Sequence, residues 1–397
     1  MRILLVNTYY APEIYGGAEY SVKKLAEALV KAGHDVCVFC TGAENAEEVI
    51  DSVRVVRVKS KHICRAAFAA SAPKFKRLIR RLQDIWNPLN GPAIIKILET
   101  FQPEVIHTNG LYDISPVIWK IAKKKNIRVV HTLRDYFLVC PRVTLSCEQV
   151  EGRCPLTICK VHRRENRKHS QYVDCVTAPS SVTLNLVTGY KLFEKAKKVV
   201  IPNACDYSDD ELAENYDRRK NNRHPFSFVY LGTLSEQKGI RWMIESFGRL
   251  EKDTAELYIA GKGELLNYVQ SAAEENVHIH YVGFLSEREV SALLSRCDVL
   301  LCPSQWEEPF GRVVLDAYKN AMPVIASNRG ALPDLVKHNE TGIIVESGNM
   351  EELVKAMSSY IQTPGLVLQH SYNAIKELKS YSIETQVEMF VKIYDNA

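Results

Sequence analysis

Short apolar runs recur along the chain and alternate with segments whose apolar residues have helical spacing. Residues 3–6 form the first run, and the glycine pair Gly16-Gly17 separates it from apolar residues at positions 22, 25, 26, 29 and 30. Intervals of three and four residues place these side chains on one helix face. Gly33 marks the end of this helix. Alternation of strands with helices predicts βαβ units around a parallel sheet.

The alternation occurs in two sets. The first set continues with strands expected at residues 36–39, 53–58, 105–107, 129–132, 175–178 and 199–201. A polar, charged segment at residues 206–224 then interrupts the pattern, and we interpret it as an interdomain linker. The second set follows at residues 226–231, 257–260, 279–282, 299–302, 323–326 and 343–345. We therefore predict an α/β fold of two doubly wound parallel sheets with an interdomain cleft, where ligands bind near the carboxyl ends of the strands.

Length and composition agree with two globular domains. The chain has 397 residues, of which 46% are hydrophobic and 25% are charged, so a disordered or fibrous chain is excluded. No stretch approaches the ~18 apolar residues of a membrane-spanning helix. Only four consecutive apolar residues follow Arg2, too few for a signal peptide. With eleven cysteines read as reduced thiols, we expect a cytoplasmic protein.

The two halves differ in charge. Residues 1–205 contain 32 Lys and Arg against 18 Asp and Glu, whereas the remainder contains 19 against 29. A basic half predicts an anionic partner, which could be a nucleic acid, a membrane surface or a small substrate. Charge alone does not distinguish among these three kinds of partner.

The segment at residues 303–316 carries the most informative chemistry. It leaves a strand, turns, and enters a helix expected near Gly311. A glycine at a helix N-terminus lets backbone N–H groups approach a phosphate. Glu308 and Asp316, eight residues apart, could accept hydrogen bonds from sugar and ribose hydroxyls. An acidic loop that binds nothing is the alternative.

Two further segments repeat this strand–glycine–helix pattern, at residues 230–239 and 260–264. In the first, Lys238 could reach a diphosphate as a point charge, although a lysine considered alone at this position would more often be a solvated residue of a helix's first turn. One such turn is weak evidence, but three in one predicted domain indicate a nucleotide site.

These segments resemble the retaining glycosyltransferases of family 4, which have the GT-B fold of two Rossmann-like domains. The family motifs are G-R-L-x-x-x-K-G, Glu-x7-Glu, G-G-x-P-E, a glycine-rich opening loop and I-P-N-G-x-D. The matching segments are residues 232–239, 308–316, 330–334, 10–19 and 201–206. The resemblance spans nearly the whole chain and is more specific in the C-terminal half.

The resemblance implies a division of roles. Residues 1–205 would bind the acceptor, residues 206–380 the nucleotide-sugar, and residues 381–397 would form a helix that crosses back to the first domain. The donor would be a UDP- or GDP-sugar acting as substrate, with no cofactor and no metal. The acceptor would be a glycan or a lipid-linked molecule, and the reaction would serve the synthesis of a bacterial surface polysaccharide.

It also implies roles for individual residues. Lys238 would neutralise the diphosphate, Glu308 would bind the donor sugar, and Asp316 would bind the ribose. The family's catalytic-cleft motif matches residues 132–136. Arg134, inside this match, and His131, which comes just before it, are therefore also catalytic candidates. The expected donor-binding residues are Gly16, Gly17, Gly232, Thr233, Lys238, Gly283, Phe284, Phe310, Gly311, Arg312, Val313 and Asp316.

The sequence departs from the family pattern at four positions. Thr233 replaces an arginine, and Asp316 and Asp334 replace glutamates. We hypothesise that Lys262 or Arg312 compensates for the lost arginine. Arg134 stands where a histidine contacts the donor sugar in the family, so that role is in question. His131, three residues earlier, is a second candidate for the cleft. The alternative interpretation is that it is an ordinary strand residue.

Four cysteines raise the question of zinc. Cys140, Cys147, Cys154 and Cys159 are separated by six, six and four residues. This spacing lacks the usual C-x2-C pair, so reduced packing cysteines are favoured and no metal is assigned.

Residues 59–86 predict a membrane-binding element. Residues 59–81 contain eight Lys or Arg and no acid. From Lys74 onward, a helical face collects the apolar residues Phe75, Leu78, Ile79, Leu82 and Trp86. Such a basic amphipathic helix can lie on an anionic membrane, peripherally on its inner face. The alternative is a helix that faces the core.

Two other functions fit the sequence less well. A sugar-nucleotide epimerase of the same fold would need no acceptor, and the basic N-terminal half argues against it. An inactive relative that binds membranes or nucleic acid would explain Thr233 and Arg134, but Lys238, Glu308 and Gly311 argue against that reading. We therefore expect no nucleic-acid partner.

Overall fold

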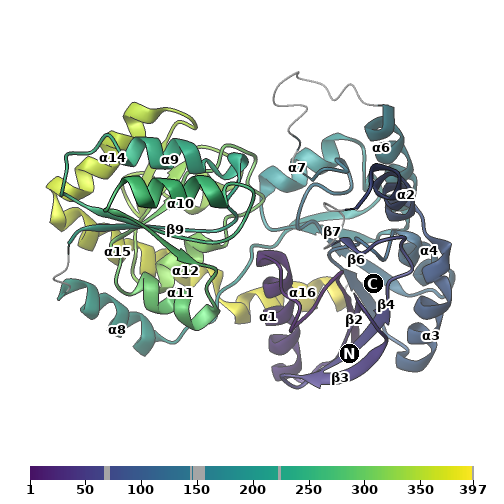
Figure 1. Cartoon of the computed structure of the whole chain (residues 1–397). Helices are drawn as coiled ribbons and strands as arrows, with labels where there is room; N and C mark the ends of the chain where they lie inside the picture. The colour runs from purple at the N-terminus through teal and green to yellow at the C-terminus, as the bar shows by residue number, and fades with distance from the viewer. Residues whose placement is uncertain (67–71, 144, 146–156, 222–224, 396–397) are drawn as a thin grey trace. The chain divides into compact units, whose positions relative to one another are not determined.

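The computed structural model describes residues 1–66, 72–143, 145, 157–221 and 225–395 (Figure 1). The chain divides into two compact units. Unit 1 comprises Met1–Asn203 and Ile383–Ala397, and unit 2 comprises Ala204–Ser382. No helix among the described residues is long and apolar enough to cross a bilayer.

Unit 1 is built on an eight-stranded sheet in the order β3-β4-β2-β1-β5-β6-β7-β8. All neighbours are parallel except β3 and β4. The strands are β1 (Arg2–Val6), β2 (Asp35–Gly42), β3 (Ala46–Ile50), β4 (Val53–Lys59), β5 (Val105–Thr108), β6 (Arg128–Thr132), β7 (Cys175–Ala178) and β8 (Lys197–Val200).

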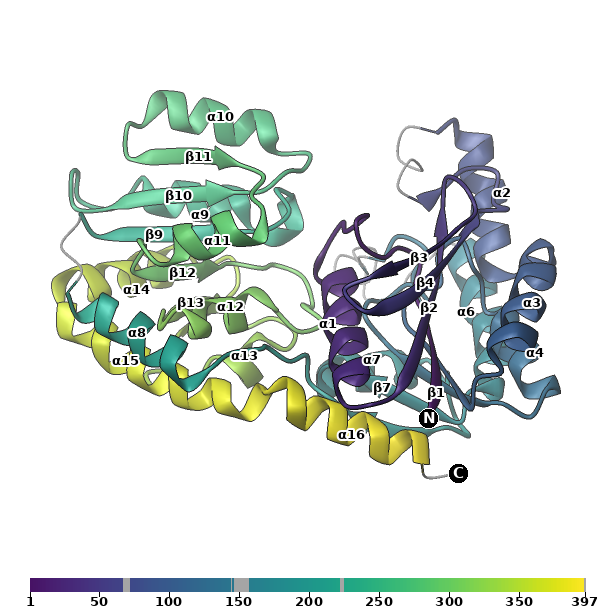
Figure 2. The same cartoon turned by 90° about the horizontal axis from the view of Figure 1, so that it is seen from below.

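Helices cover this sheet because its central strands, β2, β1, β5, β6 and β7, are buried on both faces. The α-helices are α1 (Gly17–Lys31), α2 (Lys74–Ile85), α3 (Gly91–Phe101), α4 (Val117–Lys124), α6 (Thr157–His169), α7 (Ser181–Gly189) and α16 (Ile383–Asp395), with short 3₁₀ turns at Pro88–Asn90 and Ser170–Tyr172. Ile3 and Leu5 of β1 share one buried cluster with α1 and with Phe390 and Tyr394 of α16. The C-terminal helix is therefore part of the core of unit 1 (Figure 2).

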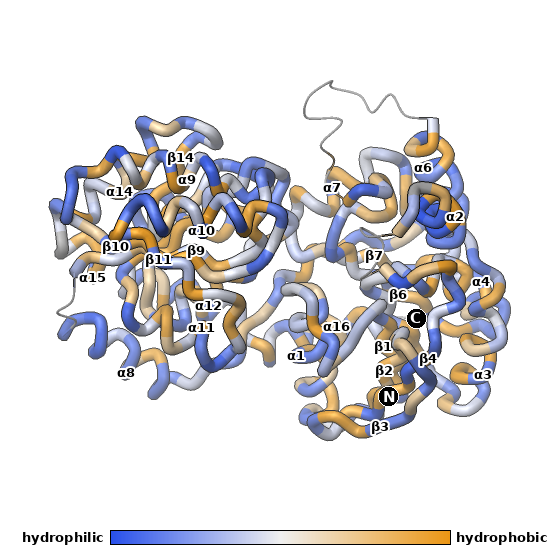
Figure 3. The backbone as a smooth tube through the Cα atoms, in the orientation of Figure 1, coloured by the Kyte–Doolittle hydropathy of each residue, from blue (hydrophilic) through white to orange (hydrophobic). Residues whose placement is uncertain are grey.

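Unit 2 is built on a six-stranded parallel sheet in the order β11-β10-β9-β12-β13-β14. Its strands are β9 (Ser227–Leu231), β10 (Glu256–Ala260), β11 (Ile279–Gly283), β12 (Val299–Cys302), β13 (Val324–Ser327) and β14 (Gly342–Val345). Successive residues of β9 and β12 enter two different buried clusters, one on each face. Hydrophobic strands run through the middle of the unit for this reason (Figure 3).

The helices of unit 2 pack on both faces of the sheet. They are α8 (Asp209–Lys220), α9 (Ile240–Phe247), α10 (Leu266–Glu275), α11 (Glu287–Leu294), α12 (Val313–Lys319), α13 (Leu332–Leu335), α14 (Met350–Gln362) and α15 (Pro364–Leu378), with 3₁₀ turns at Glu236–Lys238 and Lys379–Tyr381. One cluster contains residues of α11, α12 and α15, and the other contains residues of α9, α10 and α14. The arrangement is a doubly wound sheet.

The interpretation of residues 206–224 as a linker is wrong for most of that segment. Asp209–Lys220 form helix α8 of unit 2, capped by the Ser208 side chain, which accepts the backbone N–H of Glu211. The helix is mainly hydrophilic (Figure 3), so an apolar stripe could not reveal it. Acidic residues in its first turn and basic residues in its last complement the helix dipole.

Arg219 anchors α8 on unit 2. Its guanidinium is buried and donates to the carbonyl oxygens of Cys297 at 2.6 Å, Asn320 at 3.2 Å and Leu294 at 3.4 Å. The Asp298 carboxylate lies 3.8 Å away. Burial lowers the pKa of Arg219 to about 10, so the group is still charged near pH 7.

We expect Arg219→Ala to destabilise unit 2 by about 3 kcal/mol, because three buried carbonyls would lose a charged donor. Urea unfolding followed by circular dichroism measures the change. Arg218→Ala is the matched control, since Arg218 is exposed and should change the stability by less than about 0.5 kcal/mol. Equal effects of the two substitutions would contradict the anchoring role.

Candidate functional site

Glu308 lies in the loop between β12 and α12, at the carboxyl edge of the sheet of unit 2. Its side chain is almost buried, and its Oε2 atom accepts three hydrogen bonds: from Lys238 Nζ at 2.5 Å, from Ser304 Oγ at 2.9 Å and from Trp306 Nε1 at 3.0 Å. The second oxygen, Oε1, has no protein partner among the described residues. One oxygen is thus held in place, and the other can accept hydroxyl groups.

The charge of Lys238 keeps Glu308 ionised. Burial alone would raise the pKa of Glu308, but the charge of Lys238 and the three hydrogen bonds outweigh it and hold the pKa below its usual value. The Lys238 ammonium also lies 5.1 Å from the centre of the Trp306 ring. An ammonium has three N–H donors, so Lys238 can bind Glu308 and still donate to an anionic ligand.

Two glycines let neighbouring loops close around this pair. Gly239 follows Lys238 with φ 72°, and a Cβ there would lie 1.9 Å from the carbonyl oxygen of Pro303. Gly330 has φ 57°, and its Cβ would lie 2.2 Å from the backbone N and O of Glu308. Ala331 N–H donates to Glu308 O at 2.9 Å. The loops after β9 and β13 therefore fix the loop that carries Glu308.

Helix α12 begins two residues later than its predicted start near Gly311, with Arg312 at its N-cap and Val313 as its first residue. Arg312 donates to Asp316 Oδ1 at 3.1 Å. Burial raises the pKa of Asp316, and the Arg312 charge opposes the shift. Phe310 is buried and packs on Tyr381, so only its backbone is available to a ligand.

The remaining predicted donor-binding residues of unit 2 lie on loops after β9 and β11. Gly232 and Thr233 are exposed, and the Thr233 carbonyl accepts Tyr230 OH at 2.9 Å. Gly283 ends β11, and its carbonyl accepts the Gly261 N–H. Phe284 is 62% exposed, with the Lys262 ammonium 4.3 Å from its ring centre. An exposed aromatic ring beside a cation is available to stack on a planar ligand.

In unit 1, the predicted residues lie at the carboxyl ends of β5 and β6 and at the start of α1. Gly16 is the N-cap of α1, and Gly17 is its first residue. Arg134 follows β6; its Nε donates to Asn109 Oδ1 at 3.0 Å and its Nη1 to Asn203 Oδ1. Burial lowers the pKa of Arg134 to about 10, so it is positively charged near pH 7.

His131 lies in the core of unit 1. Its imidazole is 3% exposed, contacts the rings of Trp119 and Phe193, and shares a 2.9 Å hydrogen bond with Thr108 Oγ1. Burial lowers its pKa to about 3, so it is neutral at ordinary pH. This placement favours the alternative of a strand residue.

Sequence reasoning missed Ser304 and Trp306 as functional residues. Both shortly precede Glu308 within residues 303–316, and both donate to the same carboxylate oxygen. Ser304 is itself positioned, because its carbonyl accepts the Ser327 hydroxyl at 2.5 Å. A buried carboxylate requires donors, so polar residues close to Glu308 in sequence were the available signal.

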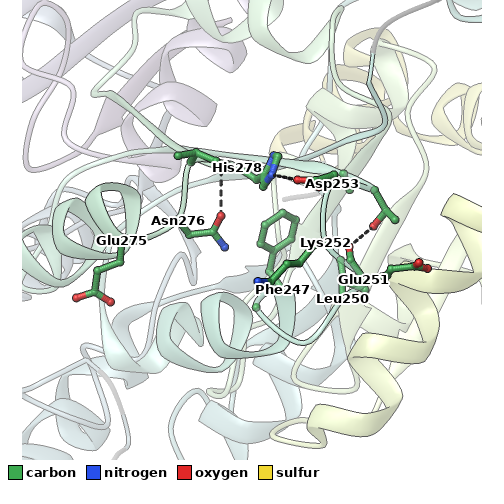
Figure 4. Close-up of a pocket in the computed structure, with 12 residues that line it drawn as sticks. Phe247, Leu250, Glu251, Lys252, Asp253, Glu275, Asn276 and His278 are labelled. Carbon is green, nitrogen blue, oxygen red and sulfur yellow. Dashed lines mark hydrogen bonds and ion pairs between the residues drawn. The ribbon is translucent and has the colours of Figure 1, made fainter.

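A pocket of about 370 Å³ in unit 2 lies elsewhere. It is lined by residues that precede β10 and β11 (Figure 4), so it lies at the amino edge of the sheet, whereas Glu308 lies at the carboxyl edge. In its wall, the imidazole Nε2 of His278 lies 2.7 Å from Asp253 Oδ1, and the backbone N–H of His278 donates to Asn276 Oδ1. Its walls hold no glycine-rich turn, and we assign the candidate site to the carboxyl edge instead.

Only two of the four cysteines considered as zinc ligands lie within the described residues. Cys140 and Cys159 are buried, whereas Cys147 and Cys154 fall outside the described ranges. Elsewhere in the described residues, His62, Asp84 and Asp113 form a buried group that could hold a metal. Arg80 bonds both carboxylates there, to Asp84 at 2.6 Å and Asp113 at 3.2 Å, and supplies the positive charge that a cation would bring.

Family models cover both units. The model described as glycosyltransferase family 4 matches residues 15–209, and that described as glycosyl transferases group 1 matches residues 213–377. The chain belongs to the group 1 and family 4 glycosyltransferases. Glycogen synthase of Mycobacterium tuberculosis is 26% identical over 96% of this chain and 91% of its own. A protein of the Klebsiella pneumoniae cps region is 27% identical over 84% of this chain and 87% of its own.

Solved structures show the same fold for this glycosyltransferase. Sucrose-phosphate synthase of Thermosynechococcus elongatus superposes with a TM-score of 0.77 at 19% identity, over 99% of this chain and 98% of that one. Anabaena Alr3699/HepE, solved with UDP-glucose, gives 0.72 at 17% identity and full coverage of both chains. Two Rossmann-like parallel-sheet domains of the GT-B type, as expected from the sequence, are confirmed.

We expect Gly330→Ala to lower the stability of unit 2 by about 2–4 kcal/mol, because alanine is strained at positive φ and its Cβ would meet the backbone of Glu308. Thermal unfolding measures the effect. Gly189→Ala is the control: no atom lies within 4 Å of its added Cβ, and alanine favours a helix. A Gly330 variant as stable as the control would show that the loop accommodates a side chain.

Proposed function

We propose that this chain is a retaining glycosyltransferase that moves a sugar from a UDP- or GDP-sugar to a glycan or lipid-linked acceptor, for a surface polysaccharide. The observation that carries the proposal is the carboxylate of Glu308, with Oε2 fixed by three donors and Oε1 without a hydrogen-bond partner in the described structure. Preorganised acceptors of this kind orient sugar hydroxyls without reorganisation during the reaction. A glycogen synthase among the relatives and a neighbour solved with UDP-glucose support this class of donor.

In the proposed reaction, Lys238 binds the donor diphosphate and Glu308 Oε1 binds hydroxyls of the donor sugar. The bond between the anomeric carbon and the leaving phosphate oxygen breaks, and the acceptor hydroxyl oxygen forms a bond to the same face of that carbon. The acceptor proton moves to the leaving diphosphate, whose negative charge is stabilised by Lys238. This route retains the anomeric configuration and needs no protein nucleophile or metal.

Thermal shifts with UDP, GDP, ADP and their sugar conjugates test the donor site. One nucleotide should stabilise the wild type by ~2.7 kcal/mol at 100 times its dissociation constant. Lys238→Ala should weaken this binding by about 1.5–3 kcal/mol, the contribution of a charged hydrogen bond. Lys252→Ala, at an exposed lysine of the same unit, should bind as the wild type does. If no nucleotide shifts the wild type, the proposed donor site is wrong.

The same samples separate a transferase from an epimerase. Glu308→Gln should keep the nucleotide shift but lose slow hydrolysis of the donor, because the amide cannot accept the same hydrogen bonds. Release of free sugar and nucleotide by the wild type supports transfer. Conversion of the donor into its epimer, with no release, would support the epimerase instead.

We further propose that helix α2 binds an anionic membrane. Its apolar face points into solvent: Phe75, Leu78, Ile79 and Leu82 are 60%, 50%, 40% and 53% exposed. The core-facing alternative is therefore wrong for these residues. The helix is held instead by Arg80, which is buried and bonds Asp84 and Asp113.

The charges around the exposed apolar face of α2 indicate that an anionic lipid surface covers it. Lys76, Arg77 and Arg81 flank the apolar face of α2, while the helix's acidic residue, Asp84, is buried in its ion pair with Arg80. Exposed apolar side chains continue beyond the helix at Ile63, Leu89 and Ile95. An amphipathic helix with basic flanks buries its apolar face at the lipid interface. A lipid-linked acceptor would be found at the same surface.

We expect the protein to sediment with vesicles that contain phosphatidylglycerol but not with pure phosphatidylcholine vesicles, and salt should weaken the binding. Leu78→Ser with Leu82→Ser should reduce the bound fraction at least about tenfold, because apolar area leaves the interface. Val277→Ser, which alters an exposed apolar side chain of unit 2, should bind like the wild type. Equal binding by all three proteins would exclude α2 as the contact.

A further inference from the structure

Two residues that line one cavity of unit 1 each carry a buried hydrogen-bond donor with no acceptor in the described structure. Asn109 Nδ2 and Arg134 Nη2 are buried, and neither has a hydrogen-bond partner among the described residues. Both residues line the same cavity of about 10 Å³ at the carboxyl ends of β5 and β6. Unpaired buried donors are costly, so their pairing at one cavity indicates a ligand atom that accepts from both.

The two donors are fixed in place. The Arg134 guanidinium is held by Nε on Asn109 Oδ1 and by Nη1 on Asn203 Oδ1. Gly110, which follows Asn109, donates its N–H to Asn7 Oδ1 at 2.7 Å. The amide and the guanidinium therefore direct their remaining N–H groups without needing a ligand to order them.

The positive charge of Arg134 has no carboxylate bonded to it in the described structure. Asp135, which lines the same cavity, accepts Tyr112 OH at 2.9 Å and Phe137 N–H at 2.8 Å instead. Glu19 is the acidic group that acts on Arg134 electrostatically, and its carboxylate accepts backbone N–H groups at the start of α1. His131, also at the cavity, is neutral. An anionic acceptor would therefore satisfy both donors and also balance the charge of Arg134.

We propose that Asn109 and Arg134 form a subsite for an anionic oxygen of the sugar substrate, either the carboxylate of a uronic acid or a phosphate oxygen. The cavity has room for about one oxygen atom, and a carboxylate or phosphate can place a single oxygen there while its other atoms stay outside. The basic character of residues 1–205 favours anionic substrates in the same way. This inference rests on the proposed function, because it specifies the substrate of that reaction.

Ligands that bypass the nucleotide site test the subsite directly. Thermal shifts of the full chain would be measured with sodium glucuronate, with glucose and with inorganic phosphate. A shift with glucuronate but not glucose identifies a uronic acid as the source, and a shift with phosphate alone identifies a phosphate. In either case Arg134→Gln and Asn109→Ala should weaken binding about 10- to 100-fold. Arg164→Gln, at an exposed arginine of unit 1, should have no effect.

The second arm compares UDP-glucose with UDP-glucuronic acid, or GDP-mannose with GDP-mannuronic acid. Arg134→Gln should reduce affinity for the uronic-acid donor alone if that donor carries the anion, and should leave the affinity for UDP or GDP unchanged. Arg134→Lys keeps the charge but not the planar set of guanidinium donors, so it should lose an intermediate amount of affinity for the anion. This variant replaces Arg134→Gln in the test if the glutamine variant does not fold.

The outcomes separate the two proposals. If no nucleotide binds the wild type but glucuronate or phosphate binds in an Arg134-dependent manner, the proposed function fails and the subsite stands. If nucleotides bind through Lys238 but no anion distinguishes the wild type from folded Arg134 and Asn109 variants, the cavity holds only a water molecule and the subsite is wrong.

Discussion

The ion pair between Lys238 and Glu308 connects the loops that form the carboxyl edge of the sheet in unit 2. Lys238 comes from the loop after β9, and Glu308 comes from the loop after β12. Gln305 N–H donates to Gln237 O at 2.7 Å, and Ala331 N–H donates to Glu308 O at 2.9 Å. Without the donors Lys238, Ser304 and Trp306, burial would favour the neutral form of the Glu308 carboxyl group, and the loops after β9 and β12 would lose their ion pair. The chemistry of the site and the packing of the loops are therefore the same interaction.

Much of the fold could be predicted because buried parallel strands leave continuous apolar runs in a sequence. Strand β3 was missed because it is polar: Ala46–Ile50 carries Glu47 and Glu48 and pairs antiparallel with β4 at the edge of the sheet. Helix α8 was missed because it packs through Leu212, Asn215 and Arg219, of which only Leu212 is apolar, so it has no apolar stripe. Both elements depend on polar contacts, and hydrophobic periodicity does not report those.

The candidate site divides in the same way. Lys238 and Glu308 stood out because glycine turns and a motif marked them, and the structure brings them within 2.5 Å. Ser304 and Trp306 carried no such mark, since only the burial of Glu308 turns a nearby hydroxyl and indole into required partners. The direction of α2 also escaped prediction. Its pattern identifies an apolar face but does not say that the Arg80 ion pairs, rather than that face, turn toward the core.

Arg134 and Arg219 show why burial alone does not identify a functional residue. Burial lowers the pKa of each to about 10. Both terminal nitrogens of Arg219 donate to carbonyl oxygens of its own unit, and only its Nε is without a partner among the described residues. Arg134 Nη2 is buried with no partner among the described residues, and Arg134 lines a cavity together with Asn109, whose Nδ2 is also unpaired. A guanidinium that packs the fold has its terminal donors satisfied by the fold. One that leaves a terminal donor at a cavity, beside a second unpaired donor, is complete only when a ligand supplies the acceptor.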